Sequence, residues 1–157
     1  MDVDRRNFAQ GKGGLDRPYN YNELVASQGG MTPLLLAARG GFAEAAKLLV
    51  GAGADVRQPG AGDKTTPILI ATINGHFDLA KWFLDQGADP NAAASNGVTP
   101  LYAALNVTWA PRALFPQPRA YLQQQITYVE YMKALLDKGA DPNLRLSKKV
   151  WYSEYNF

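Results

Sequence analysis

Residues 66–91 read TPILIATINGHFDLAKWFLDQGADPN, and this stretch carries the pattern on which the rest of the chain is built. It begins with Thr-Pro, contains two short apolar helical patterns separated by Asn74, Gly75 and His76, and ends with Gly-Ala-Asp-Pro-Asn. The same order occurs once earlier and once later, and the Thr-Pro pairs are 34 and then 33 residues apart. Self-similarity at this period predicts a stack of repeats.

Each repeat predicts a pair of helices. Proline suits the first helical turn, where its missing N–H would have no partner, and the preceding threonine can cap that turn. The glycine of Gly-Ala-Asp suits the left-handed conformation in which many helices end. In the first repeat, the apolar faces of the two helices are expected to contain Leu34, Ala37 and Ala38, and then Ala45, Leu48 and Leu49.

The third repeat departs from this plan. Its Gly-Ala-Asp lies 52 residues after that of the second repeat, which predicts an insertion of about 19 residues at about 107–126. The first half of the insertion contains three prolines and is expected to be an irregular loop. No helix breaker follows Pro118, so we expect one helix over about 118–138, roughly 30 Å long at about 1.5 Å per residue. That is roughly twice the length of its counterparts.

Composition narrows the classes of function. The 157 residues have a net charge of +2, spread along the chain, which argues against a nucleic-acid or anionic-membrane partner. There is no cysteine, so disulfide and thiolate chemistry are absent. No apolar run approaches the roughly 20 residues that span a bilayer. The sequence is compatible with the cytoplasm and equally with export after loss of a signal peptide.

These motifs resemble the ankyrin repeat. The matching features are Thr-Pro-Leu/Ile, an alanine-rich first helix, Asn-Gly-His at 74–76, a leucine-rich second helix and Gly-Ala-Asp-Pro-Asn. The resemblance implies an all-α solenoid of about three helix-turn-helix repeats with projecting turns. The third repeat and the KKVWYSEYNF tail are similar to a bacterial group of ankyrin-repeat proteins with further repeats. We therefore expect the chain to be a fragment of a longer array.

The chain also departs from the family pattern. Leucine or tyrosine replaces the histidine that usually follows Thr-Pro-Leu, at Leu35, Leu69 and Tyr102, and Lys64 replaces a turn glycine. The loss of the histidines should lower stability without changing the fold. The expected organisation is an irregular segment at 1–28, repeats at 29–143, and a tail or start of a further repeat at 144–157. The repeats span about 29–61, 62–94 and 95–143.

Asp55, Asp89 and Asp141 occupy the same place in three repeats, so we interpret them as acceptors for backbone N–H groups in turns. One carboxylate per repeat is too widely spaced to form an acid–base pair. His76 is the only histidine, and without a second histidine or a cysteine it makes a poor metal site. We expect no catalytic residue, cofactor or metal, and we expect His76 to stabilise its turn.

The concave side of an ankyrin stack is its usual contact surface, formed by the turn tips and the first helices. The resemblance places ten residues of this chain there: Gln28, Met31, Arg39, Asp63, Thr65, Ile73, Asn74, Ser95, Val98 and Asn106. The predicted insertion adds large apolar groups that either pack as a satellite core or contact a partner: Trp109, Leu114, Phe115 and Tyr121.

The sequence therefore predicts a non-catalytic protein–protein interaction module. Its partner would be another protein or a peptide, because the expected contact residues are neutral and partly apolar. The alternative is a structural spacer or assembly subunit that packs, or associates with itself, through its exposed end repeats or its aromatic tail.

Overall fold

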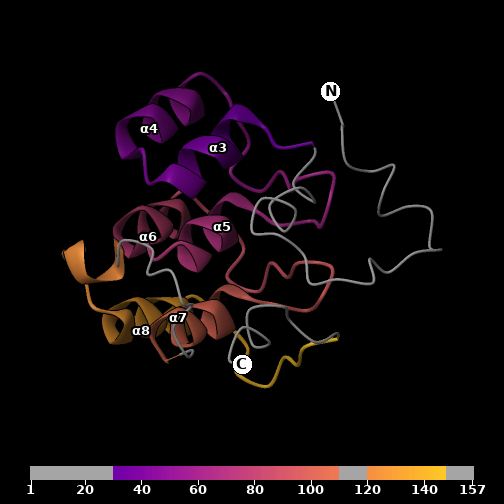
Figure 1. Cartoon of the computed structure of the whole chain (residues 1–157), viewed down its shortest axis with the longest axis vertical. Helices are drawn as coiled ribbons and strands as arrows, with labels where there is room; N and C mark the ends of the chain where they lie inside the picture. Colours follow the sequence, from indigo (N-terminus) through magenta and orange to yellow (C-terminus); the bar gives the residue numbers. More distant parts are fainter. Residues whose placement is uncertain (1–29, 110–119, 148–157) are drawn as a thin grey trace, which may run out of the picture.

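The computed structural model describes residues 30–109 and 120–147, and within these two stretches every regular element is helical. The elements are α3 (Pro33–Gly40), α4 (Ala43–Gly51), α5 (Pro67–Ile73), α6 (Phe77–Asp85), α7 (Pro100–Trp109), the 3₁₀ helix η1 (Ala120–Gln123) and α8 (Tyr128–Asp137). Figure 1 shows three helix pairs stacked along the long axis, from α3 and α4 at one end to α7 and α8 at the other. The all-α repeat fold is confirmed.

The first helix of each pair begins at Thr-Pro, as predicted. The Thr32 hydroxyl accepts a hydrogen bond from the Leu35 N–H at 3.2 Å, and the Thr99 hydroxyl accepts one from the Tyr102 N–H at 3.3 Å. Thr66 differs, because its Oγ1 is buried and has no hydrogen-bond partner among the described residues. The predicted left-handed glycines follow the second helices, at φ values of 96° for Gly53, 89° for Gly87 and 91° for Gly139.

Small residues allow the first helices to pack closely. The alanines of these helices are all buried: Ala37, Ala38, Ala71, Ala103 and Ala104. Larger side chains fill the space beside the second helices, and Phe77, Phe83, Tyr131 and Leu135 are all completely buried. The core therefore runs continuously through the three helix pairs.

Two of the six core positions predicted for the first repeat are wrong. Leu48 is 76% exposed, and Ala45 is exposed as well. In α4 the inward stripe is Ala46 with Leu49 and Val50, which are three and four residues further along the helix. Because this stripe faces the core, Leu48 is left exposed to solvent.

The single helix predicted over 118–138 is also wrong. The described part of this region contains the short helix η1, a bend at residues 125–126, and then α8, which begins at Tyr128. Thr127 and Glu130 form a capping box that fixes this start: the Thr127 hydroxyl accepts from the Glu130 N–H, and the Glu130 carboxylate accepts from the Thr127 N–H. The hydrogen bonds to Glu130 also lower the pKa of its carboxyl group.

A buried polar pair joins the second and third repeats. The Tyr131 and Thr72 hydroxyls lie 2.8 Å apart, and the Thr72 hydroxyl also donates to the Ile68 carbonyl at 2.8 Å. The Tyr131 ring stacks on Phe77 with 5.4 Å between the ring centroids. Burial raises the pKa of Tyr131 far above its usual value, so the phenol stays neutral inside the core.

Candidate functional site

The turns that link successive repeats form one ordered row. They project from the ends of the helices at one side of the stack, the right side in Figure 1. Each turn is joined to its neighbour by a backbone hydrogen bond: Ala61 N–H to Gly30 O at 3.3 Å, Ser95 N–H to Asp63 O at 2.7 Å, and Ser147 N–H to Asn96 O at 2.9 Å. These bonds set the spacing of the tips.

Side chains hold two of these turns in shape from within. The Asp63 carboxylate accepts from the Thr65 N–H at 2.9 Å, and the Asn96 side chain accepts from the Val98 N–H at 3.1 Å. Lys64 has a φ of 64°, in the left-handed region where glycine would be unstrained. The sequence expectation that Lys64 stands in a glycine position is therefore confirmed.

The predicted contact residues fall into groups of different exposure. Asp63, Asn74 and Ser95 are exposed. Half-buried positions are held by Met31, Arg39, Ile73 and Asn106. Thr65 and Val98 are only 7% and 1% exposed, so their side chains offer little contact area. Gln28 lies outside the described residues.

Three of these positions occupy one register on the first helices. Arg39, Ile73 and Asn106 each lie seven residues after the threonine of their Thr-Pro pair. We call the surface of these three residues, with Met31 and Tyr102, the first-helix face. Ile73 and Tyr102 both pack against a small inner cluster made of Leu69, Ala94, Val98 and Ala103.

Sequence reasoning missed Tyr102, which is half-buried where the first and second repeats have the fully buried Leu35 and Leu69. The signal was available, because a tyrosine replaces leucine at a core position of the repeat. A phenol at such a position combines apolar area with a polar end, as interface residues often do.

Asn74 lies at the other end of α5, and its side chain donates back to the Ile70 carbonyl at 2.8 Å. It therefore caps its own helix, and it lies away from the turn tips. We call this end of each helix pair, where the first helix connects to the second, the inter-helix end.

His76 joins the first two repeats at the inter-helix end. Its Nε2 lies 3.2 Å from the Arg39 carbonyl oxygen, and its ring packs so closely on Gly41 that a Cβ there would lie 2.5 Å from the ring. Burial lowers the pKa of His76, and the hydrogen bond to Arg39 partly opposes that shift. His76 has the expected structural role, but its bond crosses to the preceding repeat.

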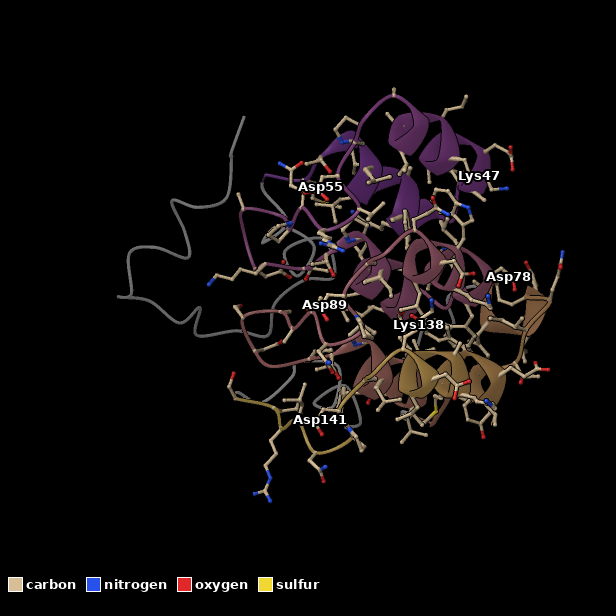
Figure 2. All side chains as sticks on the ribbon, turned by 180° about the vertical axis from the view of Figure 1, so that it is seen from behind. Lys47, Asp55, Asp78, Asp89, Lys138 and Asp141 are labelled. Atoms are coloured by element: carbon tan, nitrogen blue, oxygen red, sulfur yellow. The ribbon has the colours of Figure 1, made fainter. Side chains whose placement is uncertain are left out.

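The three repeated aspartates have structural roles, as predicted. Figure 2 shows Asp55, Asp89 and Asp141 one below another, one in each repeat. Each carboxylate accepts from the backbone N–H two residues later, at 2.8 Å in all three cases. Nothing in this arrangement brings two carboxylates together for acid–base chemistry.

The residues just after these aspartates link neighbouring repeats. Arg57 donates from Nε to the Gly87 carbonyl at 2.8 Å. Asn91 donates from Nδ2 to the Gly139 carbonyl at 2.9 Å and accepts from the Asp141 N–H at 2.8 Å. The segments that follow the second helices are therefore also fixed in register.

Of the predicted insertion residues, Tyr121 is half-buried and packs against the main core. Trp109 ends α7, but its side chain, like Leu114 and Phe115, lies outside the described residues. This burial favours a packing role for Tyr121 over contact with a partner.

The chain was compared with known families. A model described as ankyrin repeats, in three copies, matches residues 34–117. The chain belongs to the ankyrin-repeat family. No curated protein sequence matches it. Ankyrin repeats are generally protein-interaction modules and typically non-catalytic, and the predicted bacterial origin stays a prediction because the family match names no organism.

Other kinds of site find little support in the described part of this ankyrin chain. Residues 30–109 and 120–147 contain no group of three His, Asp or Glu side chains placed to hold a metal. None of the described helices is both long and apolar enough to cross a bilayer. One cleft of about 170 Å³ lies beside Thr66 and is lined by Val56, Arg57, Ile68, Asp89 and Ala92 as well. Its two charged side chains are already engaged in the hydrogen bonds described above.

Proposed function

We propose that this ankyrin-repeat chain is a non-catalytic module that binds another protein or a peptide through its first-helix face and its exposed turn tips. The observation that carries the proposal is the alignment of Arg39, Ile73 and Asn106 at one register of three stacked helices. All three are half-buried, so each leaves part of its surface accessible to a partner.

The chemistry of this surface favours a protein or peptide over a polyanion. Ile73 and Tyr102 supply apolar area, Asn106 supplies hydrogen-bonding groups, and only Arg39 carries a charge within the first-helix face. A nucleic acid or an anionic membrane would require a cluster of basic side chains. Aromatic side chains, methionine and arginine, all present on this face, are enriched in protein interfaces.

The rigidity of the surface supports the same function. Backbone hydrogen bonds join the turn tips, and Asn91 and His76 fix the repeats against each other at other sides of the stack. A surface that is already ordered loses little conformational entropy when a partner binds. The mechanism is therefore presentation of a fixed surface and involves no chemical step.

Affinity purification followed by quantitative mass spectrometry tests the proposal. The variant Arg39→Ala/Ile73→Ala/Asn106→Ala should capture at least about tenfold less of a partner that the parent protein enriches, as expected when several contacts are truncated. A matched control, Lys47→Ala/Asp85→Ala/Lys133→Ala, changes three exposed residues on the second helices and should capture as much as the parent. Equal capture by both triple variants would rule out the first-helix face.

A second candidate is an assembly subunit that packs through its ends. It is favoured by exposed apolar side chains on the two end repeats, namely Phe42 and Leu48 on the first and Val129 and Leu136 on the third. Light scattering distinguishes it from the first proposal: a concentration-dependent increase in mass is expected, and Leu48→Lys or Val129→Lys should reduce it. A constant monomer mass at high concentration would count against this candidate.

A further inference from the structure

The inter-helix end of the third repeat is built differently from the other two. In the second repeat, residues 74–76 connect α5 to α6, whereas residues 110–127 connect α7 to α8. Counting back from the Gly-Ala-Asp motif, Tyr128 corresponds to His76. His76 covers Gly41 of the preceding repeat, so the register would place Tyr128 over Gly75.

Tyr121 is the residue nearest to Gly75 instead. A Cβ built on Gly75 would lie 3.0 Å from the Tyr121 backbone nitrogen and 3.2 Å from its Cβ. Gly75 has a φ of 76°, so the turn itself also favours glycine. Residues 120–126, which we call the strap, therefore rest on the second repeat at the place where His76 rests on the first.

Asp78 fastens this strap. Its carboxylate accepts from the Gln125 N–H at 2.8 Å through one oxygen and from the Ile126 N–H at 3.1 Å through the other. Its own backbone N–H donates to the Gln124 side chain at 3.1 Å. Gln124 in turn donates to the Ala120 carbonyl at 2.9 Å, which closes the strap on itself. Figure 2 shows Asp78 on the side of α6 that faces this segment.

The corresponding residue of the first repeat forms an ion pair within its own helix instead of binding another segment. Glu44 lies at the same place in the first turn of α4, but it is 85% exposed and pairs with Lys47 of its own helix at 2.8 Å. The Asp78 contacts are therefore specific to the junction between the second and third repeats. They are not a property of every repeat in this chain.

The contacts that stack the third repeat do not pass through the strap. Tyr131 of α8 contacts Thr72 and Phe77 directly, and Asn91 reaches Gly139 and Asp141 on another side. Partly buried side chains and a few hydrogen bonds hold the strap, whereas completely buried side chains hold the helices. Segments with few buried contacts open at lower free energy than the core that they cover.

From these contacts we propose that residues 120–126 form a detachable strap, fastened by Asp78, that replaces the usual cover of the second inter-helix turn. The strap opens as a local unit while the three helix pairs remain stacked. Opening uncovers Gly75 and the first turn of α6 at the inter-helix end.

Native-state hydrogen exchange followed by NMR tests whether the strap opens locally and whether Asp78 fastens it. In Asp78→Asn, the Gln125 and Ile126 amides should exchange about ten- to a hundredfold faster, because hydrogen bonds to a charged acceptor contribute more than neutral ones. The amides of Leu135 and Ala71, in the stacked helices, should keep their rates. The matched control is Asp85→Asn on the same helix, where the carboxylate pairs with Lys81 in an exposed ion pair.

A second variant distinguishes local opening of the strap from a general loss of structure. Gln124→Ala leaves the Asp78 carboxylate in place and removes the bonds of the Gln124 side chain to the Asp78 N–H and the Ala120 carbonyl. The Gln125 and Ile126 amides should therefore be accelerated to a smaller extent. Unchanged exchange at Gln125 and Ile126 in both variants would overturn the proposal. So would a uniform increase that includes Leu135 and Ala71, because the strap would then open only with the whole fold.

Discussion

The junction between the first and second repeats differs from the junction between the second and third. The first junction relies on packed alanines, which the repeat pattern places at regular intervals, and on single links from His76 and Arg57. The second has a two-bond link at Asn91, and it adds a buried Tyr131–Thr72 pair and the Asp78 strap. The periodic sequence thus determines that repeats stack, whereas individual side chains such as Tyr131 and Asp78 determine how firmly a given pair is joined.

The largest effect is expected at Tyr131, which belongs to the second junction. Tyr131→Ala should lower the free energy of unfolding by about 3–5 kcal/mol, because it leaves a large cavity between α5, α6 and α8. Tyr131→Phe keeps the ring and should cost only about 1 kcal/mol, since Thr72 retains its bond to Ile68. Urea denaturation measures the loss of stability in both variants. The control is Val129→Ala, because Val129 lies on the same helix and is 57% exposed. Equal losses for Tyr131→Ala and Val129→Ala would contradict the comparison.

A matched pair then compares the two junctions on the side of the repeated aspartates. Asn91→Ala removes two hydrogen bonds between repeats and should cost about 1–2 kcal/mol. Arg57→Ala removes one and should cost about 0.5–1 kcal/mol. Thermal or urea unfolding of the two single variants provides the measurement. If Arg57→Ala proved the more damaging, the second junction would not be the more firmly joined one on this side.

At Thr66 the expected change in stability is smaller and of opposite sign, because this residue precedes the first helix of the middle repeat without making a capping bond. Its hydroxyl is buried and has no hydrogen-bond partner in the described residues, so Thr66→Val should be neutral or stabilise by up to about 1 kcal/mol. Thr32→Val removes a capping bond and should cost about 1 kcal/mol. Both values come from the same denaturation series. A substantial loss in Thr66→Val would show that its hydroxyl is bonded after all.

The smallest expected effect is a pH dependence confined to the first junction. Burial lowers the pKa of folded His76, whereas the unfolded residue has its ordinary pKa of about 6.5. The unfolded chain therefore binds the proton more readily, and protonation favours unfolding. Stability should be complete above about pH 6.5 and should fall as the pH decreases below it. Urea unfolding at several pH values measures this trend.

His76→Gln provides the control for that trend, because the chain contains no other histidine. The variant should lose the decrease in stability just below pH 6.5 and keep only the effects of carboxyl groups at lower pH. An unchanged decrease in His76→Gln would assign it to another group.

The fold could be predicted from sequence because the repeat occurs three times. Thr-Pro, the positive-φ glycines and the aspartate turns each have a local physical cause, and each recurs at the expected spacing. The prediction of one helix over 118–138 is wrong because the absence of a helix breaker does not by itself make a segment helical. The capping box at Thr127 and Glu130 was visible in the sequence and would have placed the start of α8 correctly.

The candidate site was harder to predict, because exposure depends on neighbours in three dimensions. Thr65 and Val98 belong to turns that project, yet both side chains fold under those turns and are buried. Asp78 could not be singled out either, since its partners lie 47 and 48 residues later and only the fold brings them together. A single sequence contains no signal for contacts of that range.

The long connection of the third repeat has one further consequence, for the entropy of loop closure. It contains eighteen residues, 110–127, where the second repeat uses three, 74–76. Closing a loop six times longer costs only about 1.6 kcal/mol more, because the cost grows with the logarithm of length. Three hydrogen bonds at Asp78, at about 1 kcal/mol each, are enough to offset it. Adding ten more residues to this connection would cost only about 0.4 kcal/mol, so this is the part of the chain where extra sequence can accumulate at little cost to the stack.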